Sequence, residues 1–343
     1  MTSEDFHDRS VLSAGYVPLD IVSYQNRVWH AAGGTAGNVP AILAFLGWRA
    51  SVVGELGADT AGQRVRRDLQ RANVSVKWLR LNENMRTPRV VHEIGARGHR
   101  FLFKCPKCGQ NLPHSRPLRV DRAIQVAERA ETPDVFFFDR LNAGTIEMAE
   151  RFADDGSFVV FEPSRPSRPD LLARAAKVAH LIKFAEDRKS RFIELSGSSP
   201  SQMCVITRGE LGATYRIGEG QWHDSPAFPY PVVDAGGAGD WTTAGIVHVL
   251  SRTIDATSKE LGDAVRWAQS LAAVSCGAPG ARGLARQQTA ETVIRAAQFL
   301  EREGEQFVVG DSRSRWRAGT APAEACQTCL QDTRVEGLVE STG

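Results

Sequence analysis

The sequence predicts one large α/β domain built on a mostly parallel sheet, with a small appendage. Short apolar runs alternate with helix-like stretches along most of the chain, which is the pattern of parallel strands joined by crossover helices. The 343 residues are long for one domain and short for two complete ones, so a single large unit fits best. The 42% of hydrophobic and 24% of charged residues are ordinary for a globular protein.

The first elements follow in order along the N-terminal third. Residues 10–23 predict a strand leading into a lid-like segment, residues 37–46 a helix, residues 50–54 a strand, and residues 60–72 a helix with Thr60 as N-cap. In residues 89–104, Val-Val-His-Glu-Ile and Arg-Phe-Leu-Phe-Lys flank a Gly-Ala-Arg-Gly turn. Two extended runs around a glycine-containing turn predict a β-hairpin rather than a strand–helix unit.

After this hairpin the alternation resumes. Short buried-type strands are predicted at residues 134–139, 158–162, 181–184 and 203–207, most of them followed by helical patterns. Residues 222–233 form a proline-interrupted extended stretch, and helices are predicted at about residues 240–250, 258–275 and 290–303. From about Val309 the chain is polar and irregular. We therefore expect one domain over residues 1–308, with a lid at about residues 86–108, and a tail over residues 309–343.

Charge and cysteine content restrict the setting and the partners. The formal net charge of +2 gives no case for a nucleic-acid or membrane partner. The polar, acidic start MTSEDFHDRS does not have the pattern of a signal peptide, and no apolar run approaches the ~20 residues of a membrane span. We expect a cytoplasmic protein, in which six cysteines argue against a disulfide framework.

The segment Asp234-Ala-Gly-Gly-Ala-Gly-Asp240 opens an apolar helix and carries the strongest chemical signal. Its small residues leave backbone N–H groups uncovered at a helix N-terminus, where those groups and the helix dipole favour an anion. Asp240 lies in the first turn, where the positive end of the helix favours the ionised carboxylate that can accept a proton. The segment predicts a base beside a site for developing phosphoryl charge; the alternative is a glycine-rich turn that merely precedes an aspartate.

Two distant parts of the chain together resemble the PfkB/ribokinase carbohydrate kinase family. Gly33-Gly-Thr-Ala-Gly-Asn38, the later Leu46-Gly47 and Gly57-Ala-Asp59-Thr-Ala-Gly62 are similar to its first signature. The segment around Gly237-Ala-Gly-Asp240 is similar to its second, in the family's order. The resemblance covers about residues 10–305 and implies a ribokinase-like three-layer α/β/α sandwich with a mostly parallel sheet and a β-hairpin lid. It also implies ATP- and Mg²⁺-dependent transfer of the γ-phosphoryl group to a hydroxyl of a sugar or sugar-like molecule.

The resemblance implies a role for each matching residue. Asp240 is expected as the catalytic base, with Gly237, Ala238 and Gly239 as the anion hole. The acceptor is expected to contact Asp20, Gly34, Asn38 and, on the hairpin, Arg100. Considered alone, Asp20 would be read as an exposed loop residue and Asn38 as a helix N-cap.

The nucleotide is expected along another set of segments. Thr207-Arg-Gly209-Glu-Leu-Gly212 resembles the family's T-x-G-x-x-G loop, and Ser275-Cys-Gly-Ala-Pro-Gly-Ala281 its late loop. The family's N-x-x-E element should fall near Lys183-Phe-Ala-Glu186, where no asparagine is present. Lys183, Glu186, Thr207, Gly209 and Gly212 are therefore the expected cofactor-binding residues.

Further departures indicate a divergent member. The usual D-T-x-G-A-G-D-x-F is here D-A-G-G-A-G-D-W-T, so that Trp241 follows the base and either walls the acceptor site or packs in the core. Phe161-Glu-Pro-Ser-Arg165 stands where a D-x-N-x-R element is common.

Two C-x-x-C pairs form the second strong signal. Cys105-Pro-Lys-Cys108-Gly109 has the spacing of a zinc knuckle, and Cys326-Gln-Thr-Cys329 repeats that spacing in the tail. We expect Cys105, Cys108, Cys326 and Cys329 to hold one structural Zn²⁺, within one chain or shared across a dimer; the alternatives are a redox pair or surface thiols.

The sequence leaves the acceptor open. A nucleoside kinase of the same fold is the first alternative, since Trp29 and Trp241 could stack on a base. A non-catalytic, zinc-stabilised binding or regulatory protein is the second. A homodimer through the lid is expected from the resemblance, because exposed lid edges in this family often pair.

Overall fold

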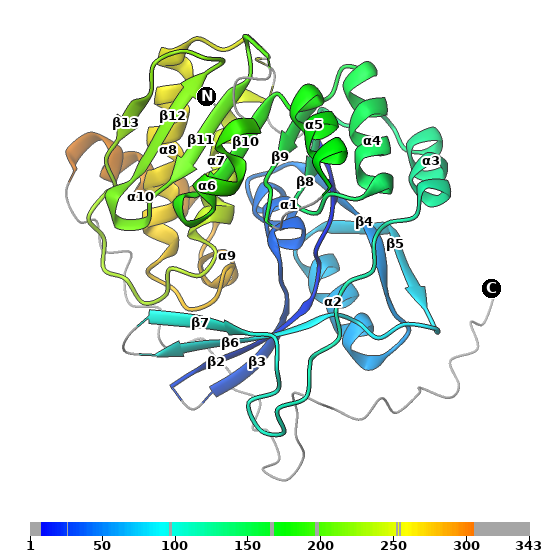
Figure 1. The fold of residues 1–343 in the computed structure, drawn as a ribbon. Helices are drawn as coiled ribbons and strands as arrows, with labels where there is room; N and C mark the ends of the chain where they lie inside the picture. Colours follow the sequence, from blue (N-terminus) through cyan, green and yellow to red (C-terminus); the bar gives the residue numbers. More distant parts are fainter. Residues whose placement is uncertain are drawn as a thin grey trace.

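The computed structural model describes residues 8–25, 27–95, 98–164, 168–195, 199–251, 253 and 255–304. Over this range the chain forms a large sheet between two layers of helices, with a smaller sheet at one end (Figure 1). In the described part of the chain, no helix has the length and apolar character needed to span a membrane.

The large sheet has nine strands, in the order β13-β12-β11-β10-β9-β8-β1-β4-β5. The pairs from β11 to β5 are parallel, whereas β12 and β13 add an antiparallel edge. The strands are β1 (Ser10–Ala14), β4 (Arg49–Gly57), β5 (Val74–Asn82), β8 (Val135–Phe138), β9 (Phe158–Phe161), β10 (Leu181–Ala185), β11 (Met203–Thr207), β12 (Ala213–Ile217) and β13 (His223–Ser225). Strands β8 and β9 are buried at every position, as expected for parallel strands covered on both faces.

Helices cover the two faces of this sheet with separate hydrophobic cores. One face packs against α1 (Thr35–Phe45), α2 (Thr60–Arg71), α7 (Ala238–Leu250), α8 (Ser258–Ser275) and α10 (Ala290–Glu303). The other packs against α3 (Val120–Arg129), α4 (Ala143–Asp154), α5 (Pro169–Val178) and the short α6 (Lys189–Phe192). The short helix α9 (Gly283–Gln287) follows α8. The ribokinase-like α/β fold expected from the sequence is confirmed.

The lid is larger than the predicted hairpin. Strands β6 (Arg89–Gly95) and β7 (Gly98–Leu102) form that hairpin, but β2 (Leu19–Tyr24) and β3 (Arg27–Ala32) join it in a sheet of order β3-β2-β6-β7. Residues 10–23, predicted as a strand leading into a lid-like segment, therefore contribute strands to both sheets. The chain leaves the large sheet after Ala14 and passes through Gly15, at φ 148°, and Pro18 before pairing again.

Other boundaries differ locally from the sequence prediction. Asp59, not Thr60, caps α2, because its side chain accepts from the Gly62 N–H at 2.8 Å. Only His223–Ser225 of the extended stretch at residues 222–233 pairs as a strand. The division at residue 308 and the tail lie outside the described residues, and dimer formation through the lid stays a prediction.

Candidate active site

The N-terminus of α7 presents backbone N–H groups without a side-chain cap next to Asp240. Gly237 is the N-cap, in a left-handed conformation at φ 92°, and no side chain caps the helix. A Cβ on Gly237 would lie 2.5 Å from Ala281, so both conformation and space require glycine here. The first N–H groups of a helix have no acceptor within the helix, and those of Gly239 and Asp240 can therefore serve an anion. The residues Gly237, Ala238 and Gly239 lie at this helix N-terminus, and their role as an anion hole stays a prediction.

Asn38 contacts Asp240 across 202 residues of sequence. Its Nδ2 donates to Asp240 Oδ2 at 2.7 Å, and both side chains are buried. Asn38 lies inside α1 rather than at its N-cap, which is Gly34 at φ 71°. The Asn38 Oδ1 atom is buried without a hydrogen-bond partner, and such an atom normally has one. The geometry leaves that oxygen to accept from a hydroxyl of a bound molecule.

Lys183 contacts the N-terminus of α7 from the neighbouring strand β10. On β10 its ammonium donates to Glu162 Oε1 at 2.9 Å and to the carbonyl of Gly239 at 2.8 Å. Thr243, one turn further along α7, donates to the second Glu162 oxygen at 2.7 Å. Lys183 is only 1% exposed. It therefore holds the N-terminus of α7 in place, and its buried position does not fit the nucleotide contact we expected from the sequence.

The surroundings of Asp240 raise its pKa. Burial is the largest cause and the nearby Glu162 carboxylate adds to it, while Lys183 and the hydrogen bonds from Asn38 and Thr35 oppose it; the result is a pKa of about 6. From the sequence we expected the helix N-terminus to favour the ionised form, and burial opposes that effect. A carboxylate with a pKa near 6 is ionised in most molecules at pH 7 and is also a stronger base than an ordinary aspartate.

A small cavity lies between the lid, α1 and the late loop. It measures about 10 Å³, and its lining includes Asp20, Trp29, Asn38, Gly280 and Arg282. That volume holds about one water molecule. Burial raises the pKa of Asp20 to about 7; Asp240 and Asp68 add to the rise, and Arg282 and Arg286 oppose it. Asp20 and Asn38, both predicted as acceptor contacts, therefore line the same small cavity.

The lid touches the anion loop through two histidines. His92 Nε2 and His99 Nδ1 lie 3.7 and 3.2 Å from Asp234 Oδ1. Asp234 also accepts from the backbone N–H groups of Gly236 and Gly280, each at 2.8 Å. Burial alone would raise the pKa of Asp234, but the two histidines and the Gly236 N–H outweigh it and hold that pKa well below its usual range. These contacts join the lid, the anion loop and the late loop around one carboxylate.

Four of the predicted nucleotide-binding residues, Glu186, Thr207, Gly209 and Gly212, lie near the carboxyl ends of β10 and β11. Thr207 ends β11 and pairs with Ala185 at the end of β10, and the exposed Glu186 follows directly. Gly209 and Gly212 have φ values of 57° and 89° in the turn after Thr207. A Cβ on Gly212 would lie 2.2 Å from the Ser225 carbonyl oxygen. The turn after Thr207 therefore presents backbone without side-chain cover at the carboxyl end of β11.

Other predicted residues lie elsewhere. Arg100 is exposed on β7 and pairs with Glu93 at 2.6 Å, away from the acceptor cavity's lining. Trp241 is fully buried and donates to the Ala281 carbonyl at 2.9 Å, so of its two predicted roles it takes the packing one. Cys105 is buried and Cys108 exposed, in a turn closed by the Gly109 N–H on the Cys105 carbonyl. Cys326 and Cys329 lie outside the described residues.

Sequence reasoning missed three side chains of this site. From the sequence, Glu162 is only part of a departure from a family element, and His92 and His99 have no predicted role. A signal existed for Glu162, because a charged residue directly after a fully apolar strand lies at the carboxyl edge of a parallel sheet, where ligands bind. For the histidines, their separation by seven residues across a hairpin gave none.

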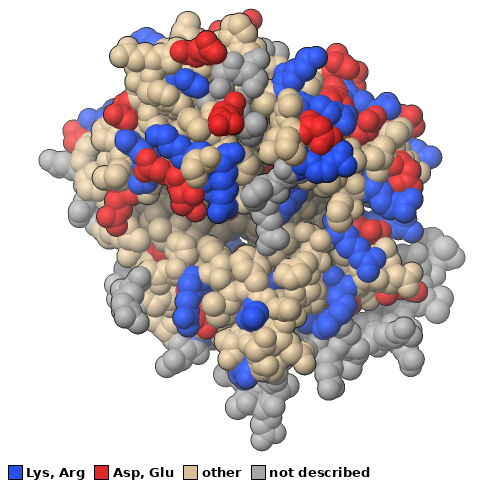
Figure 2. Space-filling model, in the orientation of Figure 1, with Lys and Arg blue, Asp and Glu red and all other residues tan. Residues whose placement is uncertain are grey.

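Figure 2 shows a hollow across the middle of the molecule, with basic side chains along its rim. A parallel α/β sheet with an anion loop, a buried carboxylate and a lid at its strand ends defines a phosphotransferase of the small-molecule kinase class. The chain belongs to the pfkB family of carbohydrate kinases, whose model matches residues 8–288.

Curated relatives and a solved structure agree with this assignment. Aminoimidazole riboside kinase of Salmonella typhimurium is 28% identical over 300 residues, which cover 78% of this chain and 89% of that protein. A fructokinase of Klebsiella pneumoniae is 26% identical, covering 66% and 79%. The crystal structure of aminoimidazole riboside kinase from Salmonella enterica, with aminoimidazole riboside and an ATP analog, has a TM-score of 0.65 at 22% identity. It covers 84% of this chain and 100% of that chain.

The raised pKa of Asp20 predicts a pH-dependent effect of its replacement. With a folded-state pKa of about 7 against the ordinary aspartate value of 3.8, the native state holds a proton that the unfolded chain releases between those pH values. This contribution to stability is full at low pH and is lost as pH rises toward 7. The melting temperature of Asp20→Asn should therefore rise relative to wild type between pH 5 and pH 8. A constant difference across that range, measured by circular dichroism, would contradict the raised pKa of Asp20 in the folded protein.

Proposed function

We propose that this chain transfers the γ-phosphoryl group of ATP to a hydroxyl of a sugar or riboside, with Asp240 as the base. The observation that carries the proposal is the contact of Asn38 with Asp240 at the N-terminus of α7. It joins an acceptor-binding amide, a base of suitable pKa and an anion-binding backbone at one point. In-line phosphoryl transfer needs little beyond positioning and charge stabilisation.

Each residue has a distinct part in the proposed reaction. Asp20 and the Oδ1 of Asn38 orient the acceptor, so that one hydroxyl faces the Asp240 carboxylate. Asp240 takes up the proton of that hydroxyl as the new oxygen–phosphorus bond forms. The N–H groups of Gly239 and Asp240 stabilise the charge on the transferred group. Closure of the lid excludes water, which would otherwise accept the phosphoryl group.

In this proposal the nucleotide lies along the carboxyl ends of β10 and β11, next to Thr207, and its γ-phosphate is directed at the N-terminus of α7. Glu186 is the carboxylate that would help to hold Mg²⁺, because it is exposed at these strand ends and Mg²⁺ prefers oxygen ligands. Glu162 is engaged by Lys183 and Thr243 and does not have that freedom. When bound, Mg²⁺ neutralises charge on the phosphate oxygens.

A nucleoside acceptor is the second candidate. Trp29 lines the acceptor cavity, and the indole lies 3.5 Å from the position of a Cβ on Gly280. A flat aromatic wall of this kind can stack on a base. Turnover of fructose, aminoimidazole riboside and inosine, assayed side by side, would distinguish a sugar preference from a nucleoside preference.

Asp240→Asn tests the assignment of the base. The variant keeps the size and most hydrogen bonds of the side chain but cannot take up the proton, so turnover should fall by ~10²-fold or more. Calorimetry should find ATP affinity changed by no more than about twofold. Asp155→Asn, at an exposed turn after α4, is the matched control and should match wild type. Near-normal turnover of Asp240→Asn would contradict the proposal.

We also propose that Cys105, Cys108, Cys326 and Cys329 bind one structural Zn²⁺. Four thiolates fill a tetrahedral site and leave no open position for catalysis. Protein purified without added metal should contain about one zinc per chain, lost in the double variant Cys326→Ser, Cys329→Ser. Because His92, His99 and Asp234 also place three ligand atoms within 4.8 Å of one another, His99→Gln is the control and should retain the zinc. A metal-free native protein would contradict the proposal.

A further inference from the structure

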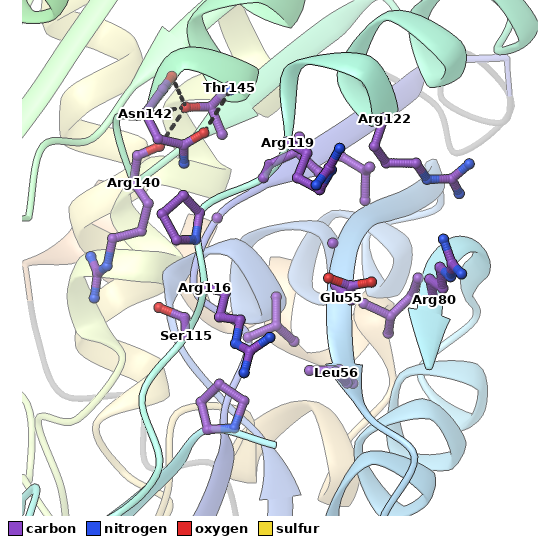
Figure 3. A pocket seen from close by; sticks show the side chains of 18 of the residues that line it. Glu55, Leu56, Arg80, Ser115, Arg116, Arg119, Arg122, Arg140, Asn142 and Thr145 are labelled. Atoms are coloured by element: carbon purple, nitrogen blue, oxygen red, sulfur yellow. Dashed lines mark hydrogen bonds between the residues drawn. The ribbon is translucent and has the colours of Figure 1, made fainter. Parts of the chain in front are cut away.

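A second, larger cavity lies next to α3 and α4, the helices on the other face of the sheet from α7. It measures about 400 Å³ and opens at the carboxyl ends of β1, β4, β5 and β8, below α3 and α4 (Figure 3). The base and Asn38 belong to α7 and α1, which pack on the other face. Neither Asp20, Asn38 nor Asp240 lines this cavity. It is therefore a separate space from the acceptor site.

Arginine side chains dominate the charge of this cavity. Its lining includes five arginines and two carboxylates: Arg80, Arg116, Arg119, Arg122, Arg140, Glu55 and Asp121. Strand alternation explains part of this set. Trp78 of β5 packs into the core beneath α3 and α4, so Arg80, two residues later, extends from the same face of the sheet. In Figure 3 the Arg80 and Arg122 side chains extend toward the same end of the cavity.

Two of these arginines have carboxylate partners within the protein. Arg119 makes a two-pronged pair with Asp121 at 2.9 and 3.0 Å, and Arg140 lies 3.4 Å from Asp139. The remaining charged side chains of the lining are one carboxylate, Glu55, and three arginines, Arg80, Arg116 and Arg122. Together they give a local excess of two positive charges. A phosphate monoester carries about −1.5 to −2 at pH 7, so its charge matches this excess.

The contacts of Arg116 and Arg122 hold their side chains in place. Arg116 donates to the Asn84 carbonyl at 3.0 Å. Arg122 donates to Gln125 Oε1 at 2.6 Å and lies over the Trp78 ring, 6.0 Å from its centre. These contacts reduce the entropy lost when a ligand is bound and occupy only some of the five N–H groups of each guanidinium. The remaining donors suit the oxygens of a phosphate.

We propose that this arginine pocket, lined by Arg80, Arg116 and Arg122, binds a small phosphorylated metabolite at a site distinct from that of the phosphoryl acceptor. Its volume suits a small ligand, and Ser115 and Asn142 line it as partners for hydroxyl groups. The inference does not depend on which hydroxyl compound the catalytic site uses. It assigns the ligand by charge and size: a phosphate ester of a short polyol.

The pocket also adjoins the segment that leads to the acceptor site. Gly15 and Val17 line it, and the intervening Tyr16 donates its backbone N–H to Asp139 at 2.8 Å. The Tyr16 carbonyl in turn lies against Gly34, where a Cβ would approach it to 2.1 Å. A ligand in the pocket therefore contacts the chain that places Gly34 and Asp20, so we expect it to change the KM for the acceptor more than kcat.

Calorimetry with glycerol 3-phosphate as the probe tests the pocket directly. The full-length protein is first saturated with a non-hydrolysable ATP analogue and Mg²⁺, so that the nucleotide site does not bind the probe. Arg80→Gln and Arg122→Gln should each weaken probe binding by about tenfold or more, since each removes charge-assisted hydrogen bonds to phosphate. Arg129→Gln, on the same helix as Arg122 but outside the pocket, should bind like wild type.

A second control separates this pocket from the catalytic site. Asn38→Ala alters the proposed acceptor site and should leave probe affinity within about twofold of wild type, since Asn38 does not line the pocket. Loss of probe binding in Asn38→Ala would show that the probe occupies the acceptor site, and would overturn the proposal. Wild-type affinity in both pocket variants, or no binding to wild type at millimolar probe, would overturn it as well.

Discussion

Lys183 places a positive charge inside the protein, beneath the first turn of α7. It is held there by Glu162 and the Gly239 carbonyl, and Thr243 completes the network. Removing either member of a buried ion pair leaves the other uncompensated, at a cost of about 3–5 kcal/mol. The same contacts also fix where the N-terminus of α7 lies relative to β10, because Lys183 of β10 binds the Gly239 carbonyl at that end of the helix. The position of Asp240 therefore depends on this contact.

The network also sets the chemistry of Asp240. Glu162 raises the pKa of the base and Lys183 lowers it, against a larger rise from burial. The two charged groups that position α7 are thus the same two that tune its carboxylate. On the other side of the base, Asn38 supplies a hydrogen bond from α1. Asp240 is thus held between two helices and a strand, and the small sheet contacts the segment before α7 through His92 and His99, which lie against Asp234.

The local parts of this site could be predicted from the sequence, because each of them lies within one short segment of the chain. The glycines before Asp240 and the spacing of Gly34 and Asn38 each follow from what a helix N-terminus and a tight approach require. The contacts between segments could not be predicted in the same way. Lys183 meets Glu162 and Gly239 across 21 and 56 residues, so their meeting depends on the order of the strands. Lys183 could therefore be predicted as part of the site, but not that it would be buried beneath the loop.

The lid, too, could be predicted only in its local part. The turn residues predicted the hairpin, yet pairing with β2 and β3 requires the chain to leave the large sheet after Ala14. That exit passes between the two cavities: Tyr16 contacts Asp139 on one side and Gly34 on the other. The segment that turns the chain into the lid is thus also the physical link between the arginine pocket and the acceptor site.

The pH dependence of kcat/KM in Glu162→Gln tests the account most directly. The wild-type acid limb should lie near pH 6, where Asp240 loses its proton. Glu162→Gln keeps the shape of the side chain and removes the like charge, so its acid limb should move to lower pH. Thr243→Val, which removes a hydrogen bond to Glu162 without changing charge, should leave the limb near the wild-type value. An acid limb of Glu162→Gln at or above the wild-type pH would contradict the claim that the Glu162 carboxylate raises the pKa of Asp240.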